Sequence, residues 1–324
     1  MRCLTALNPG GREDPVSDRY AAIDCGTNAL RLLIAEVAGG VVHDVVREMR
    51  TVRLGEGVDA TGSFSPAALV RTFDACDEYA RLMREYPVRN VRFVATSAAR
   101  DVVNREQFVS GVRVRLGVEP EVISGDEEAK LSFRGAVAGL SDIRMPVLIA
   151  DIGGGSTEFV FGDAAGVRAS ISTPIGCVRM SERSLHSDPP TREEIEAACA
   201  HIRRALADVP HVVPVGEARQ FIGVAGTVTT IVAMALDLPG YDPRVIHGAT
   251  ITRSQVEQVT DALLAMNHRQ RAALPFMHPG RVDVIGGGAL VLRESMVVLG
   301  IDSVTASETD LLDGIVCTLS LMDE

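Results

Sequence analysis

The pattern of hydrophobic and polar positions predicts an alternation of strands and helices from about residue 19 to the end of the chain. In the first half, short apolar or alternating runs predict strands, and a run in which apolar residues recur every three to four positions predicts a helix. Ser65 and Pro66 suit the start of that helix as N-cap and first-turn residue. The expected strands cover 19–23, 30–37, 41–46 (with Gly39-Gly40 as the turn before it), 91–95 and 121–123, and the expected helices 65–86, 104–116 and 124–140.

The second half of the chain repeats this plan. Thr191 and Glu194 form a capping-box pattern at the start of one of its helices. The expected strands cover 147–151, 157–161, 167–173, 220–224 and 302–305, and the expected helices cover 178–184, 191–206, a segment that begins at 225, 254–266, 286–298 and 309–321. At 324 residues the chain is long enough for two domains.

A glycine-rich turn lies between two expected strands at Asp151-Ile-Gly-Gly-Gly-Ser-Thr-Glu158. Gly153, Gly154 and Gly155, followed by Ser156, let backbone N–H groups approach an anionic ligand closely. Asp151 and Glu158 bracket the turn with two carboxylates, which suits a divalent cation held against a phosphate. An ordinary hairpin needs fewer glycines, so we favour a phosphate-binding turn.

A second turn of the same kind occurs near the start of the chain. Asp24-Cys-Gly26-Thr27-Asn28 also connects an apolar strand to a following strand. The two turns occupy matching places in the two halves. If they face each other across a cleft, they would clamp one phosphorylated ligand between them.

Composition narrows the classes of function. The net charge of −11 argues against non-specific binding of nucleic acid or membranes, so an anionic substrate must be held locally by arginine, metal and backbone N–H groups. No apolar run approaches the ~18 residues that span a bilayer. The six cysteines are scattered without a CxxC pair, which favours reduced thiols in the cytoplasm, and the seven histidines lack zinc-ligand spacing.

Five motifs occur in order along the chain and together resemble the exopolyphosphatase / guanosine pentaphosphate phosphatase (Ppx/GppA) family in its short form, within the actin/Hsp70/sugar-kinase superfamily. The motifs are Asp24-Cys-Gly-Thr-Asn-Ala-Leu-Arg31, Ala95-Thr-Ser-Ala-Ala-Arg100, Ile123-Ser-Gly-Asp-Glu-Glu128, Asp151-Ile-Gly-Gly-Gly-Ser-Thr-Glu158 and Val224-Ala-Gly-Thr-Val-Thr-Thr230. In addition, Val284-Ile-Gly-Gly-Gly-Ala-Leu290 resembles the adenosine motif of the superfamily. The chain ends after the second domain, without the extra helical region of the long members.

The resemblance implies an α/β fold with two ribonuclease H-like (actin-like ATPase) domains that face each other across a cleft. We expect a flexible tail at 1–17, a first domain at 18–143 and a second at 144–324. The last helix of the chain is expected to pack back on the first domain.

The resemblance also implies hydrolysis of a terminal phosphoanhydride by water. Glu128 is the expected general base, with Glu127 as its rival, and Arg100 is the expected catalytic arginine. Asp151 and Glu158 are expected to hold Mg²⁺, or another divalent cation, with Asp24 assisting. The phosphate seat is expected to comprise Gly26, Thr27, Asn28, Arg31, Ser97, Gly153, Gly154, Gly155, Ser156, Gly226 and Thr227, the last two because they open a helix.

The leading functional hypothesis is an Mg²⁺-dependent, cytoplasmic exopolyphosphatase that releases orthophosphate from inorganic polyphosphate. The alternative is removal of the 5′-terminal phosphate of guanosine pentaphosphate, which shares the same chemistry. More remote alternatives are a phosphotransferase similar to sugar or acetate kinases and an actin-like nucleotide sensor. Neither nucleic acid nor a membrane is expected as a partner, and the resemblance implies a homodimer.

Overall fold

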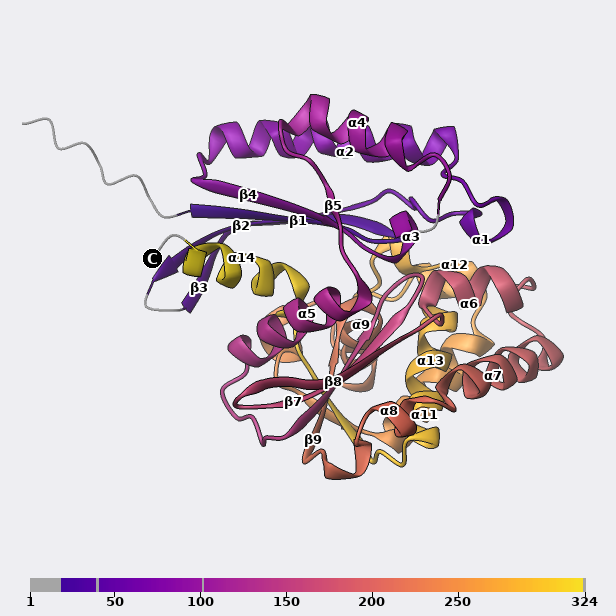
Figure 1. Ribbon diagram of the computed structural model, residues 1–324. Helices are drawn as coiled ribbons and strands as arrows, with labels where there is room; N and C mark the ends of the chain where they lie inside the picture. Colours follow the sequence, from indigo (N-terminus) through magenta and orange to yellow (C-terminus); the bar gives the residue numbers. More distant parts are fainter. Residues whose placement is uncertain (1–18, 39–40, 101, 323–324) are drawn as a thin grey trace, which may run out of the picture.

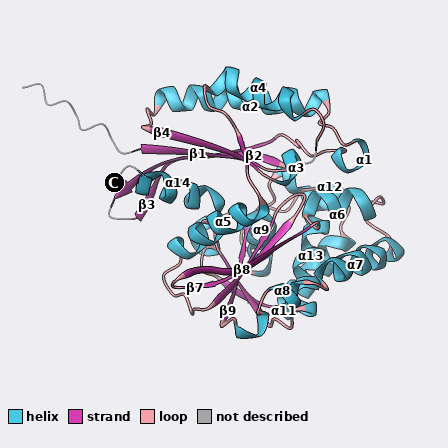
Figure 2. Ribbon diagram, in the orientation of Figure 1, coloured by secondary structure: helices cyan, strands magenta, loops and turns pink. Residues whose placement is uncertain are grey.

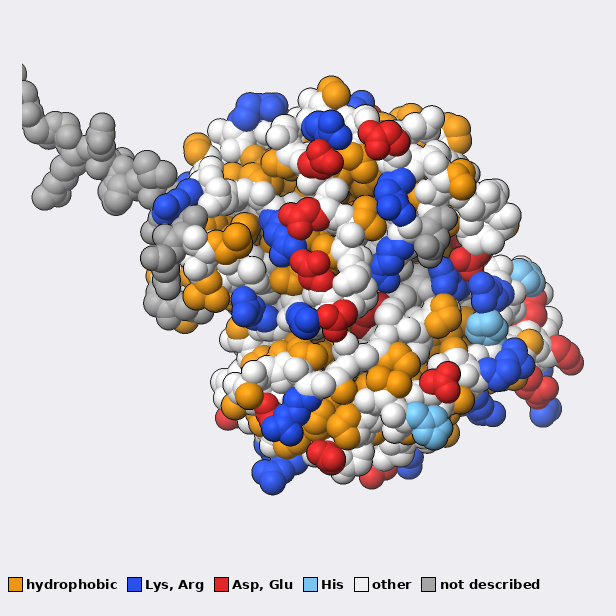
Figure 3. All heavy atoms as spheres, viewed as in Figure 1, with side chains coloured by type: hydrophobic (Ala, Val, Ile, Leu, Met, Phe, Trp, Pro, Cys, Tyr) orange, Lys and Arg blue, Asp and Glu red, His pale blue; other side chains and the backbone are white. Residues whose placement is uncertain are grey.

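The chain folds into two lobes, each built on a mixed β-sheet, with helices between and outside the sheets (Figures 1 and 2). The computed structural model describes residues 19–38, 41–100 and 102–322, so the expected tail at 1–17 and the turn Gly39-Gly40 lie outside the described residues. None of the helices described is both long and apolar enough to cross a membrane. On the face shown in Figure 3, acidic and basic side chains are interspersed over both lobes.

The first lobe contains a five-stranded sheet in the order β3-β2-β1-β4-β5. Helices α2 (Pro66–Glu85) and α4 (Arg105–Leu116) cover one face of it (Figure 1). Between them and the sheet lie buried aromatic side chains, among them Tyr79, Phe93 and Phe108. The strands are β1 (Arg19–Cys25), β2 (Ala29–Ala38), β3 (Val41–Thr51), β4 (Asn90–Ala95) and β5 (Glu121–Val122), and two short helices are α1 (Val58–Thr61) and α3 (Ser97–Arg100).

The second lobe contains a six-stranded sheet in the order β10-β11-β9-β6-β7-β8. Its strands are β6 (Val147–Ile152), β7 (Thr157–Asp163), β8 (Gly166–Thr173), β9 (Gln220–Val224), β10 (Thr250–Thr252) and β11 (Ser303–Ala306). Its helices are α6 (Cys177–Ser184), α7 (Arg192–Leu206), α8 (Val209–Val212), α9 (Ala225–Ala235), α10 (Pro243–Ile246), α11 (Arg253–Ala265), α12 (His268–Ala272) and α13 (Ile285–Val298). Read as β8-β7-β6-β9-β11, the sheet repeats the order of the first lobe, which confirms the predicted fold class.

Two helices cross between the sheets, α5 (Gly125–Gly139) and α14 (Leu311–Met322) (Figure 1). Side chains of α5, including Phe133, pack on the second sheet, whereas side chains of α14, including Ile315, join the core of the first sheet. A Cβ atom at Gly135 would overlap the carbonyl oxygen of Asp310, and one at Gly314 would overlap that of Leu131. The boundary expected between residues 143 and 144 separates the strands of the first sheet from those of the second along the chain. The two helices do not respect it, because α5 precedes the boundary but packs on the second sheet, and α14 follows it but packs on the first.

The structure differs from the expectation mainly in where strands and helices begin and end. Strand β3 continues to Thr51, beyond the expected end at residue 46, because it pairs with β2 along its whole length up to the partners Ala29 and Thr51. The short elements β10, α1, α8, α10 and α12 were not expected, since three to five residues carry too little periodicity to be recognised.

Candidate active site

The two glycine-containing turns lie directly against each other. Both connect antiparallel strands, with Asp24 opposite Arg31 in one hairpin and Asp151 opposite Glu158 in the other. A Cβ atom at Gly155 would lie 2.8 Å from Oγ1 of Thr27 and 2.9 Å from Oγ of Ser97. Glycine is therefore required here by the close approach of the two lobes.

A cavity of about 130 Å³ lies between the turns. Thirteen of the residues predicted from the sequence line it: Asp24, Gly26, Thr27, Asn28, Arg31, Ser97, Glu128, Asp151, Gly153, Gly154, Ser156, Gly226 and Thr227. Four predicted residues do not line it. Gly155 faces Thr27 and Ser97 beside it, Glu158 lies buried on β7, Arg100 contacts Glu128 from α3, and Glu127 lies on the surface.

Glu128 and Glu127 lie in very different surroundings although they are neighbours in the first turn of α5. Glu127 is half exposed and forms an ion pair with Arg92. Glu128 is only 7% exposed and forms an ion pair with Arg100, whose Nε also donates to the carbonyl of Ile123 at 3.0 Å. Burial raises the pKa of Glu128 well above its ordinary value, with Glu158 adding to the effect and Arg100 opposing it. The geometry therefore favours Glu128 as the group that accepts a proton.

Asp151 and Glu158 form a buried pair of carboxylates across strands β6 and β7. Oδ2 of Asp151 accepts a hydrogen bond from Ser132 on α5 at 2.8 Å, and Glu158 accepts one from Ser172 on β8 at 2.7 Å. Burial, with Glu158 adding to it, raises the pKa of Asp151 to about 7. Burial also raises the pKa of Glu158. Two such carboxylates bind a proton or a cation readily, because either neutralises charge in a buried site.

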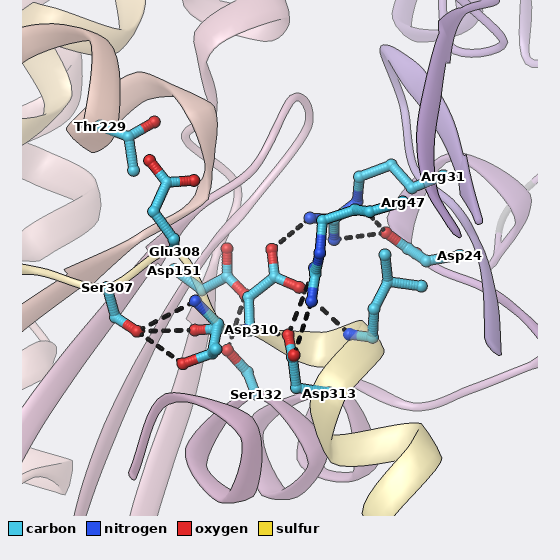
Figure 4. Close-up of polar contacts among 12 residues, drawn as sticks. Asp24, Arg31, Arg47, Ser132, Asp151, Thr229, Ser307, Glu308, Asp310 and Asp313 are labelled. Atoms are coloured by element: carbon cyan, nitrogen blue, oxygen red, sulfur yellow. Dashed lines mark hydrogen bonds and ion pairs between the residues drawn. The ribbon is translucent and has the colours of Figure 1, made fainter. Parts of the chain in front are cut away.

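Arg31 links Asp24 to a carboxylate that the sequence did not single out, Asp310 (Figure 4). Nε and Nη2 of Arg31 both donate to Oδ2 of Asp24, at 2.9 and 2.6 Å, while Nη1 donates to Asp310. Arg47 forms a neighbouring ion pair with Asp313 at 2.7 Å. Asp310 escaped sequence reasoning because a polar residue just ahead of a helix resembles an ordinary cap.

The cavity contains acceptor atoms that lack donors. Oδ1 of Asp24 and Oδ1 of Asn28 are buried and have no hydrogen-bond partner. Unpaired buried acceptors are costly and suit a cation or its water molecules. No three His, Cys, Asp or Glu side chains within residues 19–38, 41–100 and 102–322 form a group that could hold a metal ion by themselves. Mg²⁺ nevertheless fits these residues, because it typically takes few protein carboxylates and completes its shell with water and substrate phosphate.

The side of the cavity formed by α9 favours an anion. Ala225 adopts a left-handed backbone conformation (φ 69°), and Gly226 and Thr227 open the helix, whose N-terminus attracts negative charge. A Cβ atom at Gly226 would overlap the guanidinium of Arg281, which also lines the cavity. Nη1 of Arg281 donates to Oγ1 of Thr230 at 3.1 Å, and no carboxylate of the described residues forms an ion pair with it. Sequence reasoning missed Arg281, although it lies just ahead of the glycine run 286–288.

That glycine run, expected to resemble an adenosine motif, serves helix packing in this structure. A Cβ atom at Gly287 would lie 2.6 Å from Oγ of Ser181, and one at Gly288 would lie 2.6 Å from Cγ2 of Thr227. Both glycines therefore let α13 approach α6 and the start of α9 closely, which helps to position the anion-binding end of α9.

A second cavity of about 460 Å³ adjoins the first and shares Arg31, Met49, Ala225, Gly226 and Arg281 with it. Half of its remaining lining residues are apolar or aromatic and half are polar or charged. The first group is Tyr241, Pro243, Pro275, Phe276, Met277, Pro279 and Leu312, and the second is Arg47, Glu48, Thr229, His278, Ser307, Glu308 and Asp310.

Comparisons with known proteins identify the family to which the chain belongs. Residues 33–322 match the Ppx/GppA phosphatase family. Exopolyphosphatase 2 of Mycobacterium tuberculosis is 50% identical over 315 residues, which cover 93% of this chain and 98% of that protein. Among solved structures, an exopolyphosphatase-like protein is 42% identical with a TM-score of 0.90, over 94% of this chain and 100% of that one. The Ppx/GppA family member of Aquifex aeolicus is 30% identical with a TM-score of 0.79, over 94% and 98%. This chain therefore belongs to the Ppx/GppA phosphatase family.

Proposed function

We propose that this protein is an exopolyphosphatase that releases terminal orthophosphate from inorganic polyphosphate. The observation that carries the proposal is the buried carboxylate of Glu128 in a cavity formed by two facing phosphate-binding turns. The similarity to an exopolyphosphatase over almost the whole chain supports the same substrate.

In the proposed reaction, Glu128 orients a water molecule and takes a proton from it as the oxygen attacks the terminal phosphorus. The bond between that phosphorus and the bridging oxygen breaks. The products are orthophosphate and a polyphosphate chain shorter by one unit. Arg100 pairs with the carboxylate of Glu128 and opposes the rise of its pKa, which favours the ionised form. The raised pKa of Glu128 makes it a stronger base than an exposed glutamate.

The other residues hold the phosphate chain in line. We propose that the N–H groups of residues 26–28 and 153–156, the start of α9, the hydroxyl of Ser97 and the guanidinium of Arg281 face the phosphoryl oxygens. Asp151 and Glu158, with Asp24, would hold Mg²⁺ directly or through water. When bound, Mg²⁺ supplies positive charge that offsets the charge on the phosphoryl oxygens.

The second candidate substrate is guanosine pentaphosphate. The adjoining cavity of about 460 Å³ combines apolar and aromatic side chains with three arginines and three carboxylates, a mixture that suits a nucleoside together with its phosphates. Tyr241 in that wall offers an aromatic surface, and Arg281 stands at the junction of the two cavities with its Cζ 5.9 Å from the centre of the Tyr241 ring.

Orthophosphate release from polyphosphates of graded length and from guanosine pentaphosphate tests the proposal. We expect turnover of polyphosphate in the presence of Mg²⁺, and preferential turnover of guanosine pentaphosphate would favour the second candidate. Absence of orthophosphate release from both would overturn the proposal. Phosphate transfer from ATP to a sugar or to acetate would instead identify a kinase.

Assembly and location form part of the proposal. We propose a homodimer, which light scattering on the purified protein tests. We also propose that the protein acts in the cytoplasm, because the five cysteines within the described residues are all free, as expected where thiols stay reduced.

A further inference from the structure

Asp24 receives an unusual hydrogen-bond pattern from Arg31. A guanidinium commonly binds a carboxylate as a fork, with one N–H group on each oxygen. Here Nε and Nη2 both donate to Oδ2, at 2.9 and 2.6 Å, and Oδ1 is left without a partner. Asp24 is only 4% exposed and lines the catalytic cavity. The free oxygen therefore belongs to a buried carboxylate in the place where a cation would be needed.

Asp310 accounts for this pattern. Its Oδ2 accepts Nη1 of Arg31, and its Oδ1 accepts the backbone N–H of Leu312 at 3.1 Å. Asp310 is 5% exposed, so its carboxylate is fixed at the start of α14. Because Nη1 is held there, the guanidinium is fixed in the position in which both Nε and Nη2 meet Oδ2 of Asp24.

A comparison of the two hairpins indicates why Asp24 needs a free carboxylate oxygen. The residue opposite Asp151 is the carboxylate Glu158, whereas the residue opposite Asp24 is the cation Arg31. An arginine that covered both oxygens of Asp24 would leave that hairpin with no free carboxylate oxygen for a metal ion. Because Arg31 also pairs with Asp310, it contacts only Oδ2 of Asp24, and two carboxylates lie against its positive charge.

We propose that Asp310 is a positioning residue that acts through Arg31 to keep Oδ1 of Asp24 free for the divalent cation. The inference rests on the proposed function for the identity of the bound cation, and it extends that function by a residue outside the five motifs on which the family resemblance was based. It also gives Arg31 a role different from the phosphate contact expected from the sequence. Outer-shell partners of metal ligands typically affect metal affinity by about 10–100-fold.

The test compares Asp310→Asn with Asp313→Asn. Both residues lie at the start of α14, both are buried, and both pair with an arginine of the first sheet, but Asp313 pairs with Arg47 and not with Arg31. Binding of Mn²⁺ or Mg²⁺ to each purified variant is measured by titration calorimetry without substrate. The Mg²⁺ concentration for half-maximal polyphosphate hydrolysis and the KM for polyphosphate at saturating Mg²⁺ are measured separately.

We expect Asp310→Asn to weaken cation binding by about tenfold or more and to raise the half-saturating Mg²⁺ concentration equally, with little change in KM. Asp313→Asn should lose thermal stability but keep cation affinity, because asparagine retains an oxygen that can accept the backbone N–H of Asp310, as Oδ2 of Asp313 does at 2.8 Å. Lysine lacks the planar fork with which Arg31 contacts Asp24 and Asp310 together, so Arg31→Lys should resemble Asp310→Asn. It provides a second variant if Asp310→Asn folds poorly.

Two results would overturn the inference. Unchanged cation affinity in a folded Asp310→Asn protein would show that the network is only structural. A lower KM for polyphosphate in that variant would show that Asp310 restrains an arginine whose partner is the substrate. If the wild-type protein binds the cation but does not hydrolyse polyphosphate, the proposed function fails while the inference about Asp24 stands.

Discussion

At the scale of single residues, burial determines which of two adjacent glutamates can act as a base. Glu127 and Glu128 follow the same cap, Ser124, whose side chain accepts the N–H of Glu127 at 3.2 Å. One turns towards Arg92 at the surface and the other towards Arg100 beside the cavity. Burial of the second, Glu128, raises its pKa.

Replacing Glu128 by Gln should abolish proton transfer while preserving the shape of the site. We expect kcat to fall by ~10²–10⁴-fold, the usual contribution of a general base, with substrate binding retained. Glu127→Gln is the matched control and should keep nearly the wild-type rate. Initial rates of orthophosphate release, with binding measured separately, would distinguish the two. An equal loss in both variants would show that the first turn of α5 matters only for folding.

The protonation of Asp151 should connect stability, pH and metal binding. Because its pKa is raised from 3.8 to about 7, the folded protein keeps a proton that the unfolded chain has already lost. This contribution to stability is complete below pH 3.8 and is lost as the pH rises through about 7. Mg²⁺ competes with that proton, so Mg²⁺ should raise the melting temperature more at pH 8 than at pH 6. Asp151→Asn should remove most of this difference in thermal melts, and an Mg²⁺ effect independent of pH would contradict the assignment.

The sequence predicted the residues around the cavity more completely than the contacts among them. The turns could be located because three glycines or a Gly-Thr-Asn segment between strands is a local pattern. Asp310 and Arg281 could not be found in this way, because their importance depends on where segments more than 50 residues distant meet them in space. For the same reason, the pairing of Arg31 with two carboxylates was not visible in the sequence.

At the scale of elements, the crossing of α5 and α14 depends on glycine. Residues 135–139 of α5 read Gly-Ala-Val-Ala-Gly, a segment rich in small side chains, whose packing partner is not evident from the sequence. In the structure, Gly135 lies against the backbone of Asp310, and Gly314 lies against the backbone of Leu131. The two helices thus touch backbone to backbone, at the junction of the lobes.

Gly135→Ala should therefore destabilise the protein, although alanine is normally the better helix former. We expect a loss of about 1–3 kcal/mol in the free energy of unfolding, because the backbone of Asp310 must move. Gly286→Ala in α13 is the control, since its Cβ would make an ordinary contact of 3.4 Å with Leu264, and it should be neutral or stabilising by up to ~1 kcal/mol. Denaturant unfolding measures both. A stabilising effect of Gly135→Ala would mean that the helices can separate at no cost.

At the scale of the whole molecule, the global charge and the local site act against each other. The net charge of −11 repels a polyanion, whereas in the proposed function the turns, Arg281 and the start of α9 would attract its phosphates. Composition predicted this conflict, and the repeated order of strands was foreseeable from the repeated turns. The packing of the last helix, α14, on the first lobe was expected from the family resemblance. The matching packing of α5 on the second sheet was not, because packing between distant segments leaves no periodic signal.

Raising the salt concentration within a limited range should increase the rate at which the protein captures polyphosphate. As ionic strength rises from about 0.01 to 0.1 M, the screening length falls from ~30 to ~10 Å, which weakens the long-range repulsion more than the contacts in the cavity. We expect kcat/KM to rise over this range at saturating free Mg²⁺. Glu193→Gln combined with Glu196→Gln, on the exposed part of α7, should reduce the effect. A steady fall of kcat/KM with salt would show that the local positive charge dominates even at long range.

The glycine crossing also has a mechanical consequence. Glu128 lies seven residues from Gly135 along α5, so at 1.5 Å per residue its lever arm is ~10 Å, whereas Asp310 lies against Gly135 at the crossing itself. A change of ~10° in the angle between the two helices would move Glu128 by ~2 Å and leave Asp310 almost in place. Opening the lobes would thus withdraw Glu128 from the cavity while the contact between Asp310 and Arg31 persists, and closing them would bring Glu128 back.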